Sequence, residues 1–233
     1  SSDLNFSKIS DIGCARTGLI TGLDDVFLFS KNKFHELELE KDILLPVLTG
    51  TDPDRYEIPI PNNFVIYPYE LKNENTEIIS EDIFQNKFPK TYDYILTKKD
   101  KLLKRKDSRK TFESKKNWFG LTRFGKLNIF KNLKIVTPGE VKQNKFTIDK
   151  DSGFLNARVF CVNITDSQYN LYYVLGMLNS KVVQFYLHKT APLKQGGYYS
   201  YATKFLNNVP IPLLNDDSQK QVIERVQEII SLK

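Results

Sequence analysis

The sequence predicts a mixed α+β fold that is strand-rich in its first part and ends in helices. Before Tyr69, glycines and turn residues separate short apolar runs, which is typical of short strands. From Pro89 the apolar residues change to three- and four-residue spacing, which indicates amphipathic helix. Strands and helices do not alternate in a βαβα order, so we expect no doubly wound parallel sheet.

The first segment contains three closely spaced glycines, Gly13, Gly18 and Gly22, followed by the apolar run Val26–Phe29. Because glycine tolerates positive φ, we expect a tightly turning loop that leads into a strand at this run. Thr49–Asp54 is a strong turn signal, and Phe64–Tyr69 reads as a short strand edged by proline.

Tyr92, Ile95, Leu96, Leu102 and Leu103 follow Pro89 at helical spacing. This pattern predicts one amphipathic helix with a strongly cationic face. Residues 118–123 and 129–138 are again typical of strands and turns. Two further strands, at 146–149 and 159–162, are expected to flank a loop at 151–153.

Asp166 is expected to cap a helix that runs to Leu178 and resumes beyond Asn179 and Ser180. Ser218 and Gln221 form a capping-box pattern before the final amphipathic helix. We therefore predict a recognition domain over residues 1–215 and a C-terminal helix, a connector or partner-docking element, over residues 216–233.

Charge is distributed unevenly along the chain. The 34 Lys and Arg residues outnumber the 28 Asp and Glu residues by six, yet residues 87–116 alone hold twelve cations against four acids. A solvated helix face is the simplest interpretation, but confinement of the charge to one segment favours contact with phosphates. The candidate phosphate-binding residues are Lys98, Lys99, Lys101, Lys104, Arg105, Lys106, Arg109, Lys110, Lys115 and Lys116.

Two segments combine aromatic, polar and basic side chains as base-contacting loops do. In the first, Arg123 follows Trp118 and Phe119 and is the expected guanine reader; in the second, Gln195 beside two glycines is a possible adenine reader. Trp118 as a core anchor and the paired glycines as a plain connector are the alternatives. The candidate set is Arg16, Thr21, Trp118, Phe119, Arg123, Lys194, Gln195, Gly196, Gly197, Tyr198 and Tyr199.

One pattern suggests an enzyme instead. Asp54 after Pro53, with Glu70 and Lys72 further on, resembles the carboxylate-plus-lysine arrangement of magnesium-dependent nucleases. Serine-nucleophile, zinc-protease and nucleotide-binding motifs are absent from the sequence, and no resident metal site is expected. The two cysteines give no disulfide framework and no apolar run spans a membrane, so a cytoplasmic location is expected.

Read together, several segments in order resemble the TaqI-like C-terminal specificity domain of adenine-N6 DNA methyltransferases, which also occurs in Eco57I-type restriction-modification enzymes. The segments are Gly18–Phe27, Leu45–Asp52, Val65–Tyr69, Tyr92–Arg105, Trp118–Phe119, Lys134–Pro138, Leu175–Lys181, Gly196–Gly197 and Phe205–Pro212.

The resemblance implies a module that binds double-stranded DNA, reads its sequence and positions the duplex for adenine methylation. No Pro-Pro dipeptide and no glycine-rich cofactor loop occurs in this sequence. Catalysis and S-adenosylmethionine binding are therefore expected to belong to an N-terminal part of the parent protein, and the present chain is expected to bind no cofactor. Its protein partner would be that methyltransferase domain or a separate methyltransferase subunit. The alternative is a specificity-subunit module whose final helix docks a partner.

Overall fold

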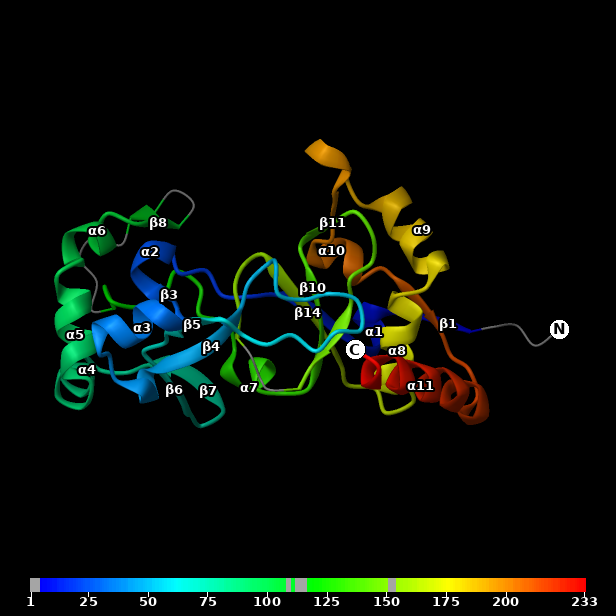
Figure 1. Ribbon diagram of the computed structural model, residues 1–233, viewed down its shortest axis with the longest axis horizontal. Coiled ribbons are helices and arrows are strands. Elements are labelled where there is room, and N and C mark those ends of the chain that lie inside the picture. The colour runs from blue at the N-terminus through cyan, green and yellow to red at the C-terminus, as the bar shows by residue number, and fades with distance from the viewer. Residues whose placement is uncertain (1–4, 108–109, 112–116, 151–153) are drawn as a thin grey trace. The chain divides into compact units, whose positions relative to one another are not determined.

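The computed structural model describes residues 5–107, 110–111, 117–150 and 154–233. The chain forms two compact units, and the second is interleaved with the first along the sequence (Figure 1). Unit 1 comprises Ser1–Gly18, Leu48–Ile60 and Asn132–Lys233, and unit 2 comprises Leu19–Val47 and Pro61–Lys131. Both units mix helices with small antiparallel sheets, which confirms the α+β class.

The centre of unit 1 is an antiparallel four-stranded sheet in the order β12-β10-β14-β2. Val136 lies opposite Cys161, and Cys161 lies opposite Arg16. Two-stranded pairs β1-β16 and β11-β15 complete its pairing. The strands are β1 (Phe6–Lys8), β2 (Gly13–Thr17), β10 (Lys134–Pro138), β11 (Glu140–Val141), β12 (Thr147–Asp149), β13 (Phe154–Leu155), β14 (Val159–Ile164), β15 (Tyr199–Ser200) and β16 (Pro210–Pro212).

The helices of unit 1 build its core against this sheet. The long terminal helix α11 packs along α8 (Figure 1), and both contribute to one apolar cluster that includes Tyr173, Leu175 and Val226. Helix α11 thus belongs to unit 1. Its expected role as a connector or partner-docking element stays a prediction. The helices are α1 (Ile9–Ile12), α8 (Leu171–Leu178), α9 (Lys181–Thr190), the 3₁₀ turn η2 (Gln195–Gly197), α10 (Thr203–Leu206) and α11 (Asp216–Ser231).

An ion pair lies inside the unit 1 sheet. Lys134 on β10 and Asp149 on β12 are cross-strand partners, and the Lys134 Nζ lies 2.5 Å from a carboxylate oxygen of Asp149. Their side chains are 0% and 2% exposed. Each buried charge is compensated only by its partner, so separating the two strands would leave both charges unpaired. The ion pair therefore stabilises the pairing of β12 with β10.

Unit 2 contains an antiparallel sheet in which β5 lies between β4 and β3, and two hairpins, β6-β7 and β8-β9. Its strands are β3 (Leu28–Ser30), β4 (Leu44–Leu48), β5 (Asn63–Ile66), β6 (Tyr69–Lys72), β7 (Asn75–Ile78), β8 (Lys106–Asp107) and β9 (Lys110–Thr111). Its helices are α2 (Asp24–Phe27), α3 (Lys31–Leu37), the 3₁₀ turn η1 (Lys41–Ile43), α4 (Glu81–Lys87), α5 (Pro89–Leu96), α6 (Lys99–Leu103) and α7 (Leu127–Phe130).

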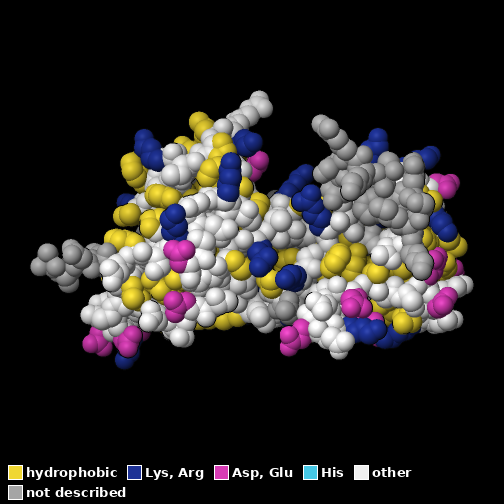
Figure 2. Space-filling view, turned by 180° about the vertical axis from the view of Figure 1, so that it is seen from behind, with side chains coloured by type: hydrophobic (Ala, Val, Ile, Leu, Met, Phe, Trp, Pro, Cys, Tyr) yellow, Lys and Arg dark blue, Asp and Glu magenta, His cyan; other side chains and the backbone are white. Residues whose placement is uncertain are grey.

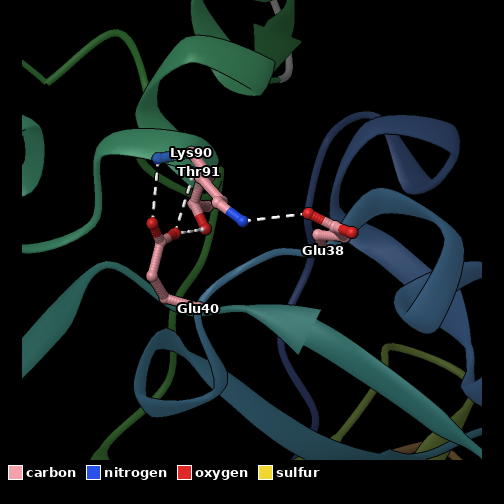
Figure 3. A network of polar contacts seen from close by, with 4 residues as sticks. All are labelled: Glu38, Glu40, Lys90 and Thr91. Atoms are coloured by element: carbon pink, nitrogen blue, oxygen red, sulfur yellow. Dashed lines mark hydrogen bonds and ion pairs between the residues drawn. The ribbon is translucent and has the colours of Figure 1, made fainter.

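A carboxylate from a distant part of the chain caps the start of α5 (Figure 3). Glu40 accepts hydrogen bonds from the amides of Lys90 and Thr91, both at 2.9 Å, and from the Thr91 hydroxyl at 2.6 Å. Partial burial raises the pKa of Glu40, but these hydrogen bonds outweigh it and the net pKa is lowered. Glu40 is therefore ionised at neutral pH and satisfies the free amides of the first turn. The Lys90 ammonium pairs with Glu38 at 3.0 Å.

Several element boundaries differ from the sequence-based expectations. The single cationic helix is interrupted between α5 and α6, where the Thr97 hydroxyl donates to the carbonyl of Tyr94 at 2.7 Å. The strand expected at Val26–Phe29 is wrong in its first half, because Thr21 hydrogen-bonds Asp24 and the chain enters α2 before β3.

Two helix starts were also placed wrongly. Asn170 rather than Asp166 caps α8, and Asn215 caps α11 three residues before Ser218, the expected cap. The start of α9 is confirmed, since the Ser180 hydroxyl accepts the amide of Val183 at 3.2 Å.

The buried ion pair gives a stability prediction. Lys134→Met should lower the free energy of unfolding by about 3–5 kcal/mol, because it leaves the Asp149 charge buried without its partner. The double variant Lys134→Met, Asp149→Leu should recover most of that loss. Urea unfolding followed by circular dichroism measures both, and equal losses in the single and double variants would contradict the prediction.

Candidate nucleic-acid interface

One arginine organises the loops of unit 2. Arg105 follows α6 and is only 4% exposed. Its Nε donates to the carbonyl of Leu102 at 3.0 Å, and one terminal nitrogen donates to Thr21 at 2.9 Å and Gly120 at 2.8 Å. The other terminal nitrogen donates to the carbonyl of Trp118 at 2.7 Å. A single guanidinium thus joins a helix end to two loops that are far apart in sequence.

The surroundings of Arg105 are compatible with a charged group. Its guanidinium lies over the ring of Phe27, with 5.4 Å between the guanidinium carbon and the ring centroid. Burial lowers the pKa of Arg105 to about 10, so the side chain remains protonated at neutral pH. The positive charge therefore strengthens each of its hydrogen bonds to a carbonyl.

The two loops held by Arg105, residues 19–23 and residues 117–124, also pair directly. The Ile20 amide donates to the Arg123 carbonyl at 2.8 Å, and the Arg123 amide donates to the Ile20 carbonyl at 2.9 Å. Gly22 has φ +80°, and a Cβ there would lie 2.2 Å from the Thr122 hydroxyl. Glycine is required at this position both for its backbone conformation and for the close approach of the loops.

Aromatic residues support the 117–124 loop. The Tyr69 hydroxyl accepts the Leu121 amide at 2.6 Å, and the Tyr67 hydroxyl donates to the carbonyl of Phe124 at 3.1 Å. Burial raises the pKa of both tyrosines, so their hydroxyls stay protonated. The Trp118 indole donates to Glu81 at 3.0 Å. These contacts fix the backbone of the loop, on which Asn117, Arg123 and Phe124 are exposed.

The structure separates the predicted unit 2 residues into interior and surface groups. Trp118, Phe119 and Thr21 are buried, and Trp118 takes the core-anchor position that the sequence left as an alternative. Arg105 is also interior, because its donors are occupied by carbonyls, so it leaves the phosphate-contacting set. The exposed basic residues are Lys101, Lys104, Lys106 and Arg123.

Two further lysines are half-buried against aromatic rings. The Lys99 ammonium lies 4.6 Å from the ring centroid of Trp118, and that of Lys98 lies 5.8 Å from the centroid of Tyr94. Arg109, Lys115 and Lys116 lie outside the described residues, and Lys110 is described only by its backbone in β9.

In unit 1 the second candidate loop is an exposed arm. Every residue from Pro192 to Tyr198 is exposed, which includes Lys194 and Gln195. Gly196 and Gly197 have φ of +77° and +80°, and a Cβ at Gly197 would meet nothing within 4 Å. Tyr199 is half-buried and stacks on His188 with 3.8 Å between ring centroids. Arg16 is exposed on β2.

The candidate nuclease residues do not form a site within either unit. Asp54 belongs to unit 1 and pairs with Lys145 at 2.9 Å, whereas Glu70 and Lys72 belong to the β6-β7 hairpin of unit 2. Partial burial raises the pKa of Asp54, but Lys145 outweighs it and the net pKa is lowered. Among the described residues, no group of three or more His, Cys, Asp or Glu is arranged to hold a metal ion.

Comparison with known proteins identifies the family. The family model of the TaqI-like C-terminal specificity domain matches residues 45–211, and the chain belongs to this family. The Escherichia coli type II restriction enzyme and methyltransferase RM.Eco57I is 25% identical over 222 residues, which is 89% of this chain and 22% of that protein. The type II methyltransferase M.MjaIV of Methanocaldococcus jannaschii is 25% identical over 230 residues, covering 95% of this chain and 72% of that protein.

Solved structures share the fold. The type IIL restriction-modification enzyme MmeI, whose structure was determined in complex with DNA, matches 99% of this chain and 30% of its own with a TM-score of 0.70 and 12% identity. The type IIG restriction endonuclease BpuSI matches 96% of this chain and 26% of its own with a TM-score of 0.59 and 17% identity. In the described part of the chain, no helix has the length and apolar character needed to cross a bilayer.

The contacts of Arg105 predict a large stability effect at that position alone. Arg105→Met removes four charge-assisted hydrogen bonds and leaves buried carbonyls without donors, so it should lower the free energy of unfolding by about 3 kcal/mol or more. Lys104→Met, at the exposed neighbouring position, should change it by no more than about 0.5 kcal/mol. Trp118, the only tryptophan, reports on this unit by fluorescence during urea unfolding. Similar losses in the two variants would contradict the interior role of Arg105.

Proposed function

We propose that this chain is the DNA target recognition module of a restriction-modification adenine-N6 DNA methyltransferase. The observation that carries the proposal is the match to the TaqI-like C-terminal specificity domain over residues 45–211. The relatives named above are type II restriction and modification enzymes, and the fold neighbour MmeI was determined in complex with DNA. The nuclease alternative is not favoured, because the matching family is a specificity domain.

The geometry supports a division of labour among the basic residues. Lys101, Lys104 and Lys106 are exposed, and ammonium groups of this kind bind phosphates without reading sequence. Arg123 is exposed on a loop whose backbone is fixed by Arg105 and by Ile20, and a guanidinium on such a loop suits a bidentate reader of guanine. Gln195 on the exposed arm of unit 1 is the corresponding candidate for adenine.

The catalytic activity would reside elsewhere in the whole protein. This chain spans 22% of RM.Eco57I and 72% of M.MjaIV, so both relatives contain sequence beyond the matched part. The methyltransferase part, on the same chain or a separate subunit, would bind S-adenosylmethionine and take the target adenine out of the stack. Residues 216–233 would connect to it or dock against it, and the enzyme would act in the cytoplasm.

Selection from a pool of randomised DNA duplexes tests the proposal. The full protein should enrich one short sequence motif, and Arg123→Ala should lose preference at one position of that motif. The lost bidentate contact should cost about 1–3 kcal/mol at that position and leave affinity for random duplex nearly unchanged. Lys126→Ala removes an exposed positive charge three residues away and serves as the matched control.

Two results would count against this account at different levels. Failure of the full protein to bind duplex DNA or to enrich any motif contradicts the function itself. An enriched motif that is the same for wild type and Arg123→Ala would remove only Arg123 from the reading set.

A further inference from the structure

A long segment of unit 1 contains no acidic residue. Residues 167–215 hold four lysines and neither Asp nor Glu, although 28 acids in 233 residues would place about six in a stretch of this length. Outside this segment and residues 87–116, the chain has 18 cations against 24 acids. The excess of positive over negative charge is therefore confined to two segments, and the second lies in unit 1.

The acid-free segment folds into neighbouring elements of unit 1. Helix α9 is joined to β15 by the stacking of His188 on Tyr199, and β15 pairs with β11. Lys142, just beyond β11, places its ammonium 5.0 Å from the ring centroid of Tyr198 on the exposed arm. These contacts bring α9, the arm and Lys142 into one continuous surface, and Figure 2 shows Lys and Arg interspersed with hydrophobic side chains over this part of unit 1.

The lysines of this surface are available to a ligand. Lys142, Lys181, Lys189, Lys194 and Lys204 are all exposed. None of the five forms an ion pair with a carboxylate among the residues that the structure describes.

Apolar and aromatic side chains lie among these lysines. Val182 and Phe185 on α9 are 77% and 65% exposed, and the Lys189 ammonium lies 5.5 Å from the Phe185 ring centroid. A groove of about 330 Å³ beside them is lined by Tyr186, Thr190, Lys204, Phe205 and Asn208. Ammonium groups bind phosphates, and exposed aromatic and apolar side chains beside them can pack against sugars. This combination is typical of surfaces that bind a nucleic-acid backbone.

We propose that α9, the arm at residues 192–198 and Lys142 form a second DNA-backbone-binding surface, separate in sequence from the lysines of residues 98–106. This inference rests on the proposed DNA-binding function and adds to it a second set of phosphate contacts. Residues 167–215 supply no acid to this surface, and Glu140, exposed on β11 opposite Ser200, is the carboxylate nearest to it in the β11-β15 pair. The exposed Gly196-Gly197 tip gives the arm backbone that approaches a duplex without steric hindrance.

The salt dependence of duplex binding tests the surface. In the full protein, Lys142→Ala, Lys189→Ala and Lys194→Ala combined should flatten the slope of log affinity against log salt by up to about three units, because each lost phosphate contact removes about 0.9. A control combines Lys8→Ala, Lys150→Ala and Lys220→Ala, which removes the same charge from exposed positions of unit 1 outside the surface. The control should leave the slope within half a unit of wild type.

Each outcome bears on a different claim. A flattened slope in the surface variant alone supports the proposal, whereas equal slopes in surface variant, control and wild type overturn it. Equal flattening in surface variant and control also overturns it, because net charge alone then explains the effect. A wild-type protein that does not bind duplex at all contradicts the proposed function itself. Unfolding curves that match wild type confirm that each variant is folded.

Discussion

The arrangement of unit 2 depends on one buried cation. Removing a guanidinium from water is unfavourable unless its N–H donors are satisfied, and Arg105 donates four hydrogen bonds to four backbone carbonyls. The same hydrogen bonds satisfy carbonyls that would otherwise be buried without donors. Three of these four carbonyls belong to the 19–23 and 117–124 loops. If the loops separated, the guanidinium would lose its acceptors and the buried carbonyls would lose their donor, and both losses are unfavourable.

This constraint explains how irregular backbone can present side chains reproducibly. The 117–124 loop has no regular secondary structure, yet its backbone is held by Arg105, by Ile20 and by the hydroxyls of Tyr67 and Tyr69. Unit 1 has its own buried polar tie, the Lys134–Asp149 pair within the central sheet. In each unit the buried polar contacts set the backbone, and Arg123 and several lysines lie exposed on it.

Sequence reasoning succeeded where the signal was local or compositional. The break at Ser180, the β10 strand and the α+β class followed from capping residues and periodicity, and the resemblance to the specificity-domain family was confirmed. The predictions were wrong where contacts with residues distant in sequence determine the position of a side chain. In the run Lys104-Arg105-Lys106 nothing local indicates that the middle residue turns inward, because the carbonyls that attract it come from residues 21, 118 and 120. The cap of α8 was misplaced because Asp166 and Asn170 are both suitable caps; the Asp166 carboxylate accepts the amide of Gln168 in a turn before the helix, and Asn170 accepts the amide of Tyr172.

Hydrogen exchange at the paired amides of Ile20 and Arg123 tests the central role of Arg105 most directly. These amides donate to each other's residues across the two loops, and their protection reports the opening of that contact. In Arg105→Lys, which keeps the charge but cannot satisfy four carbonyls, both amides should exchange about tenfold faster or more, since hydrogen bonds to a charged group contribute about 1.5–3 kcal/mol each. Amides within β10 and β14 should keep their wild-type rates. Unchanged protection of Ile20 and Arg123 in a folded Arg105→Lys protein would show that the loops are held together by something else.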